Sequence, residues 1–179
     1  MWKFYFDGED GEKTTIDVKD LKEGKVNIGV EDKEGEESGI NIESDEDGNT
    51  TMEMDTEDGT FESKSGEGTE LPDGFPKDFP LPQSAELISS TTMTEGEIIS
   101  YSVAFMFKED PEEVYSQVKE YAENNNLEIN MENKSDMDGS KSYMLGAGES
   151  GGESSEYFLF NIVVDDETMG SIMYGVPNK

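Results

Sequence analysis

Residues 71–82 read Leu-Pro-Asp-Gly-Phe-Pro-Lys-Asp-Phe-Pro-Leu-Pro and hold four of the six prolines in this 179-residue chain. Proline fixes φ, lacks an amide donor and pushes the preceding residue towards extended backbone. The stretch is therefore expected to be a stiff, irregular joint, with Phe75 and Phe79 as apolar anchors where the flanking parts meet. The composition changes on either side of it. This predicts an acidic β module over 1–70, the joint over 71–82 and an α+β domain over 83–179.

The chain is strongly acidic along its whole length. It has 44 acidic residues against 13 lysines, no Arg, His or Cys, and a formal charge of −31. Such a field repels phosphate backbones, which excludes nucleic acid as a partner. The lack of cysteine excludes disulfides and thiolate metal sites. No run of 18 apolar residues occurs, so the sequence predicts no transmembrane segment.

Pairs of apolar residues recur every 12 residues before the joint, and clusters of Gly, Asp and Glu separate them. The alternation predicts a short strand in each unit, and the clusters predict turns. Five such units are expected to form a meander, which Asp-Gly turns favour, or alternatively a β-roll or solenoid. The pairs are Phe4/Phe6, Ile16/Val18, Ile28/Val30, Ile40/Ile42 and Met52/Met54.

One acidic turn raises the question of calcium. Glu43, Asp45 and Asp47 occupy positions 1, 3 and 5 of an EF-hand-like loop, with Gly48 at position 6, and they are the candidate metal ligands. Position 12 is Met54 rather than Glu, and the flanking segments are predicted strands. A solvated turn without bound metal is therefore the competing interpretation.

The part after the joint has stronger signals. Two strands are expected over 85–91 and 98–107, and Asp110-Pro111-Glu112-Glu113 predicts a helix start because Asp caps, Pro suits the first turn and acids favour the helix N-terminus. Four more strands are expected, which gives the order ββαββββ and an antiparallel sheet with one packed helix. Their ranges are 127–132, 142–147, 156–164 and 171–176, and the third is apolar on both faces, which predicts cover on both sides.

The pattern Leu71-Pro72-x-x-Phe75-Pro76-x-Asp78-x-Pro80-x-Pro82 lies between acidic β units and a hairpin that a Pro-Glu-Glu-Val helix follows. In this it resembles a loose group of uncharacterised bacterial exported proteins, often lipoproteins. The resemblance implies a location outside the cytoplasm, at the cell surface or secreted, with the export signal and a lipidated cysteine upstream of this sequence. The chain itself has no cysteine. The group carries no known catalytic residues, so none are transferred.

These observations favour a non-catalytic cell-envelope or secreted binding protein of unknown ligand, with no cofactor. Without His, Cys or Arg, a carboxylate-dependent hydrolase is the enzyme class that stays open. Phe158, Phe160 and Tyr174 are expected to form an exposed interaction surface on the sheet face away from the helix. The alternative is a self-assembling or calcium-stabilised surface protein that associates through its β edges.

Overall fold

Six strands precede the proline-rich stretch in the computed structural model, one more than the sequence predicts. The structure describes residues 2–7, 13–20, 24–31, 37–56, 59–137, 139–149 and 155–178. The additional strand was not predicted because Phe61 is its one large apolar residue and follows Met54 by seven residues. The six strands are β1 (Trp2–Asp7), β2 (Lys13–Asp20), β3 (Lys25–Glu31), β4 (Glu37–Ser44), β5 (Thr50–Thr56) and β6 (Gly59–Ser65).

Six strands and one helix follow the stretch, in the predicted order ββαββββ. Every predicted strand is present, with ends that shift by up to five residues. The elements are β7 (Glu86–Glu95), β8 (Ile98–Met106), α1 (Pro111–Asn124), β9 (Glu128–Met137), β10 (Ser140–Gly148), β11 (Tyr157–Val164) and β12 (Thr168–Pro177).

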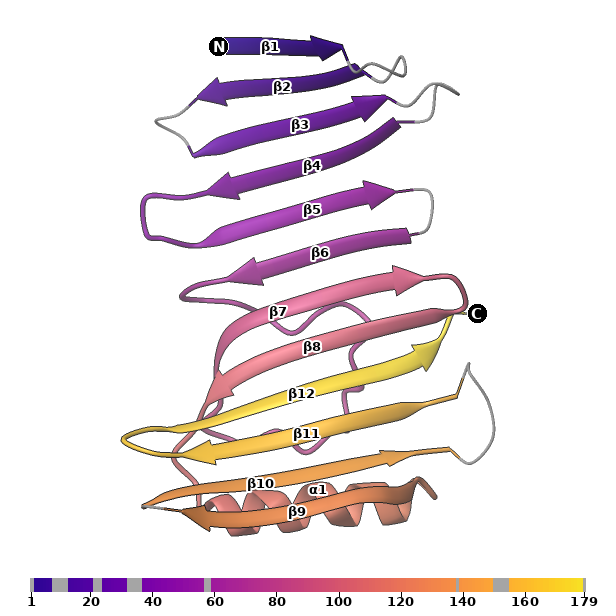
Figure 1. The fold of residues 1–179 in the computed structure, drawn as a ribbon. Helices are drawn as coiled ribbons and strands as arrows, with labels where there is room; N and C mark the ends of the chain where they lie inside the picture. Colours follow the sequence, from indigo (N-terminus) through magenta and orange to yellow (C-terminus); the bar gives the residue numbers. More distant parts are fainter. Residues whose placement is uncertain are drawn as a thin grey trace.

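All twelve strands belong to one open antiparallel sheet (Figure 1). Its order is β1-β2-β3-β4-β5-β6-β7-β8-β12-β11-β10-β9. The first eight strands follow chain order, so their arrangement is that of a meander rather than a β-roll. The protein is thus a β-rich α+β protein. Strand β6 pairs directly with β7, with Ser65 opposite Ser89, so the sheet runs without a break past the proline-rich stretch.

The helix begins where the sequence predicts. The side chain of Asp110 accepts hydrogen bonds from the backbone amides of Glu112 and Glu113 at 2.9 and 3.1 Å, and Pro111 occupies the first turn. These contacts satisfy donors that the first turn of a helix leaves free. The helix packs on β9, β10 and β11. Its buried stripe is Val114, Tyr115, Val118, Tyr121 and Ala122.

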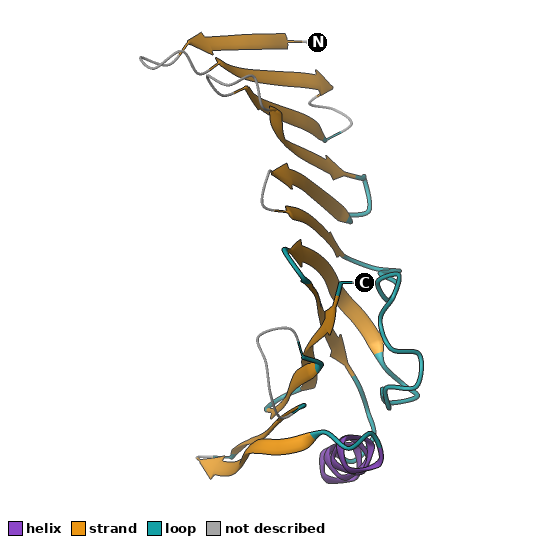
Figure 2. Cartoon of the chain, turned by 90° about the vertical axis from the view of Figure 1, so that its right-hand side faces the viewer, coloured by secondary structure: helices purple, strands orange, loops and turns teal. Residues whose placement is uncertain are grey.

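The proline-rich stretch covers the same face of the sheet as the helix (Figures 1 and 2). Phe79 lies within 5.1 to 6.3 Å of the rings of Tyr121, Phe158, Phe160 and Tyr174, measured between ring centroids. Phe75 contacts Tyr101 and Tyr174. Both anchors are buried as expected, but in the core of the C-terminal region rather than against β1–β6.

A glycine in β12 makes this core possible. Gly170 lies opposite Phe105, and a Cβ atom at position 170 would be 2.4 Å from the Phe105 ring. The Phe105 ring therefore occupies the space that a side chain at position 170 would fill. The expected cover on both faces of β11 is wrong: only the side that carries Phe158, Phe160 and Ile162 is buried, and Val163 on the other side is exposed.

Candidate interaction surface

The two faces of the sheet differ in chemistry. Residues directly opposite each other on antiparallel strands point to the same side, so the register assigns every strand residue to a face. We call the side that α1 and residues 71–82 cover the helix face, and the other side the open face. Among the described residues, no helix or loop covers the open face (Figure 2).

Rows of uncharged, mostly apolar side chains cross the open face from strand to strand. One row runs over seven strands, from β1 to β7, and a second runs over ten strands, from β3 to β9. The first is Phe4, Ile16, Ile28, Ile40, Met54, Phe61 and Met93. The second is Val26, Ile42, Met52, Ser63, Thr91, Ser102, Met173, Leu159, Gly146 and Met131.

All the methionines that the structure describes lie on this face. The chain has ten, and each one other than Met1, which is outside the described residues, is assigned to the open face by its strand partner. Among the described residues, the core on the helix face contains none. Methionine is flexible and polarisable, and it is used on surfaces that adapt to a partner. The nine are Met52, Met54, Met93, Met106, Met131, Met137, Met144, Met169 and Met173.

Charged residues avoid the open face, although 32% of the chain is charged. In the described strands they occur there only at strand ends: Glu86, Glu95 and Glu128. Eleven large hydrophobic side chains are exposed among the described residues, and nine of them lie on the open face; Tyr5 and Leu71 are the exceptions. An antiparallel sheet with one covered face usually has a polar second face. An uncovered apolar face of this extent indicates an interaction surface.

The helix face of β1–β6 is charged instead. Lysines lie directly opposite carboxylates, with Nζ–O distances of 3.6 Å for Lys3–Asp17, 3.4 Å for Lys13–Glu31 and 3.1 Å for Lys25–Glu43. The side chains of these pairs are more than 40% exposed except for Asp17, at 13%, and exposed pairs contribute little stability. They keep this half of the helix face in water and leave the open face as the apolar one.

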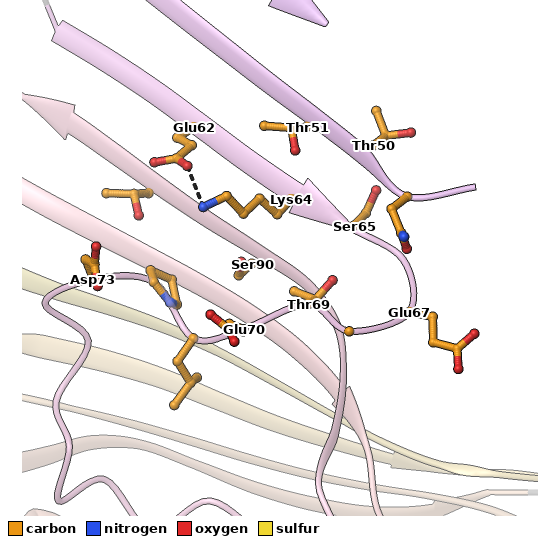
Figure 3. Close-up of a pocket in the computed structure, with 15 residues that line it drawn as sticks. Thr50, Thr51, Glu62, Lys64, Ser65, Glu67, Thr69, Glu70, Asp73 and Ser90 are labelled. Carbon is orange, nitrogen blue, oxygen red and sulfur yellow. Dashed lines mark ion pairs between the residues drawn. The ribbon is translucent and has the colours of Figure 1, made fainter. Parts of the chain in front are cut away.

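A cleft opens on the helix face between β5–β7 and the returning segment 66–73 (Figure 3). Its volume is about 500 Å³, and hydroxyl, amide and carboxylate groups dominate its lining. Lys64 Nζ lies 2.8 Å from Glu62 Oε1, and this hydrogen bond raises the pKa of Lys64. Lys64 therefore stays a cation, which does not suit a nucleophile or a base.

Two of the three candidate metal ligands, Asp45 and Glu43, have other side-chain partners, and Asp47 contributes its backbone amide. Asp45 Oδ1 accepts from the backbone amides of Asp47 and Asn49, each at 2.9 Å, and Oδ2 accepts from Asn49 Nδ2. These bonds, the one from the Asn49 side chain above all, lower the pKa of Asp45. Glu43 pairs with Lys25 across the strands. In the described part of the chain, no group of three or more acidic residues is placed to hold a metal.

The expectation that Phe158, Phe160 and Tyr174 form an exposed surface is wrong. Their side chains lie on the helix face, at most 2% exposed, beneath Phe79 and α1. The Tyr174 hydroxyl donates to Glu156 and shares a 3.0 Å hydrogen bond with Tyr121. Burial, and then these hydrogen bonds, raise the pKa of Tyr174 far above that of an exposed phenol. Which face the helix covers is a tertiary property that strand alternation alone does not determine.

The surface that the sequence analysis missed has a simple signal. In β12 the residues Met169, Ser171 and Met173 alternate with the core residues Gly170, Ile172 and Tyr174. The outward positions carry no charge, in a chain where charge is frequent. Counting charges separately on the two sides of the strands predicted before the joint would have found the open face there, whereas the strands predicted over 98–107, 142–147 and 171–176 carry no charge on either side.

The fold and this surface describe a β-rich α+β protein with an uncovered apolar sheet face. Comparison with protein-family models, curated proteins and solved structures found no match to this chain. Within the described residues, no helix is long and apolar enough to cross a membrane.

Proposed function

We propose that this protein is a non-catalytic interaction protein of the cell envelope or the extracellular space, and that it binds its partner through the open face. One observation carries the proposal: apolar rows extend over the sheet, and no described residue covers them. Nine large hydrophobic side chains are exposed on this face, and five of them are methionines: Met93, Met131, Met137, Met169 and Met173. The location follows from the resemblance to exported proteins.

The chemistry supports binding rather than catalysis. The sequence contains no His, Cys or Arg, so the common nucleophile–base pairs are missing. The cleft on the helix face holds Lys64 in an ion pair with Glu62. In the proposal the 12-residue units of the N-terminal part extend the same apolar face from β7 outwards to β1.

Amphipathic peptides test the proposal. Three labelled 18-residue helical peptides share a leucine face and carry lysine, glutamine or glutamate at their polar positions. We expect at least one to bind the folded protein in fluorescence anisotropy. Met173→Lys, which places a charge in the middle of the open face, should weaken binding of the glutamine peptide about tenfold or more. Gln117→Lys on the exposed side of α1 is the matched control and should change nothing. The proposal is wrong if no peptide binds or if Met173→Lys binds as tightly as the control.

The second candidate function is self-association through β edges. Strand β1 is an edge strand of the sheet, and its side chains Phe4, Tyr5 and Phe6 are exposed. Free strand edges pair with other chains unless charge, Pro or a bulge prevents it. Sedimentation over a hundredfold concentration range tests this candidate, because edge pairing predicts growing oligomers that Tyr5→Pro prevents. A calcium-stabilised form of this candidate predicts that millimolar calcium raises the Tm more than matched sodium chloride does.

A further inference from the structure

The open face of β7–β12 lies between two acidic borders. At the end of the strands where β7 turns into β8, the border holds Glu95, Glu97, Glu128 and Glu149. Among the described residues, no lysine lies in these turns. The charged residues of this border that the structure describes are therefore all carboxylates, and they lie beside an uncharged, largely apolar centre.

The opposite ends of the strands repeat this pattern. Glu86 begins β7, and the turn between β11 and β12 exposes Asp165, Asp166 and Glu167. Lys108 lies here too, 3.7 Å from Glu86, in a pair whose side chains are more than half exposed. The second border is therefore also acidic, with three carboxylates in a single tight turn.

Between the borders the open face is uncharged, and its methionines and aliphatic side chains lie among Ser, Thr and Asn residues. Met106 lies opposite Met169, and Met173 lies between Ser102 and Leu159. Small residues separate the large ones: Ser171 pairs with Ala104, and Gly146 with Leu159. Flexible thioethers beside small residues can repack around differently shaped apolar groups.

The dimensions match a short helix. Six strands at about 4.8 Å spacing span about 24 Å, and strands of eight to ten residues are about 26–33 Å long. An α-helix of 18 residues is about 27 Å long. Laid along the strands, such a helix covers part of the apolar centre, and its two ends lie at the two acidic borders, where basic side chains can reach the carboxylates.

We propose that the open face of β7–β12 binds a basic amphipathic helical segment of a partner protein, with the apolar side of the helix on the methionines and its Lys or Arg side chains over the two acidic borders. This inference rests on the proposed function and adds the chemistry of the partner. Charge complementarity carries it, because the apolar centre alone would accept any apolar partner.

The same charges disfavour the other occupants. A second copy that packs face to face would bring acidic border against acidic border, between chains that each carry a formal −31. Anionic lipid head groups meet the same repulsion. A basic partner is attracted from a distance, and its charges neutralise carboxylates that are otherwise close together.

The three helical peptides also test this inference. At low salt the lysine peptide should bind about tenfold or more tighter than the glutamine peptide, and the glutamate peptide should bind weakest. The preference should vanish near 0.5 M sodium chloride, since screening acts at about the distances between border and ligand. The variant Asp165→Asn/Asp166→Asn/Glu167→Gln neutralises one border. It should weaken binding of the lysine peptide about threefold to tenfold and leave the affinity for the glutamine peptide unchanged.

Two controls isolate the surface. Glu67→Gln/Glu70→Gln/Asp73→Asn removes three carboxylates from the cleft on the helix face, and it should leave the preference for lysine unchanged. Met173→Glu should weaken binding of the lysine peptide although the variant adds a negative charge to the protein, because the new carboxylate disrupts the apolar centre. Met173 is 40% exposed, so the variant is expected to fold, and its circular dichroism and Tm check this.

Each result decides the matter. The inference is overturned if the lysine and glutamine peptides bind with equal affinity. It is also overturned if the border variant and the cleft variant weaken binding of the lysine peptide equally. Either result leaves the proposed function intact. Self-association that Met173→Glu abolishes, with no preference among peptides, makes a second copy the occupant and also overturns it. If no peptide binds, the proposed function fails as well.

Discussion

The strands β1–β6 and β7–β12 share one sheet and one apolar open face, but they differ on the helix face (Figures 1 and 2). In β1–β6 that face carries lysine–carboxylate pairs such as Lys25–Glu43. In β8, β12 and β11 it carries Tyr101, Tyr174 and Phe158, which α1 and the proline-rich stretch bury. The apolar side of the first region therefore has no described cover, whereas the second region has a core.

The difference indicates where the stability lies. Cross-strand pairs contribute about 0.2–1 kcal/mol each, and a half-buried sheet face contributes less than an enclosed core. The enclosed aromatic cluster around Phe79 has several ring contacts per residue. The region β7–β12 should thus hold most of the folding free energy, while β1–β6 extends the surface.

The largest expected effect comes from the anchor of the proline-rich stretch. Phe79→Ala should lower the free energy of unfolding by about 3–5 kcal/mol, because it empties a site that is 5% exposed and lined by five rings. Phe61→Ala, at a half-buried open-face position in β6, is the matched control and should cost less than half as much. Urea denaturation followed by circular dichroism measures both. Equal losses would contradict the proposed distribution of stability.

Hydrogen exchange should show the same contrast along the sheet. Backbone amides of β8, β11 and β12 are expected to exchange about a hundredfold more slowly than those of β2–β4, since enclosed strands open only when the core opens. Mass spectrometry of peptic fragments resolves the two groups. Uniform protection from β2 to β12 would show instead that the whole sheet opens as one unit.

Much of this contrast could be predicted from the sequence. Asp110-Pro111 marks the helix start, and Phe75 and Phe79 are correctly identified as buried anchors, because these signals are local. The face assignment failed, because alternation in Tyr157–Val164 is equally compatible with either side facing the helix. The missed strand β6 has one large apolar residue, Phe61, and is held by pairing with β5 and β7, which is a long-range property.

A smaller effect on stability is expected from the buried Tyr174 hydroxyl, and the pH dependence of the free energy of unfolding tests it. Tyr174→Phe should cost about 1–3 kcal/mol, because it leaves Glu156 and the Tyr121 hydroxyl without their shared partner. The pKa of Tyr174 is raised in the folded state, so its contribution is present below the pKa of an exposed tyrosine, near 10, and is lost as the pH rises further. The stability of the wild type should therefore fall more steeply above pH 10 than that of Tyr174→Phe. Equal slopes in urea melts at pH 9 to 11 would contradict this assignment.

The smallest effect on stability should come from oxidising the methionines, and it separates the open face from the core most cleanly. Methionine sulfoxide is polar, so it disrupts an apolar surface. Because every described methionine lies on the open face, mild peroxide should change the free energy of unfolding by about 1 kcal/mol or less and leave the near-ultraviolet dichroism of the buried tyrosines unchanged.

Binding should respond quite differently to the same treatment. The oxidised protein is expected to lose its affinity for the helical peptides, and methionine sulfoxide reductase should restore it. Met169→Leu/Met173→Leu is the matched control, since it keeps the centre of the open face apolar and removes two exposed sulfur atoms. This variant should retain more binding after peroxide than the wild type does. Loss of the tyrosine signal on oxidation would mean that the open face contributes to the folding of β7–β12 as well, and that the two sides of this sheet are not energetically separate.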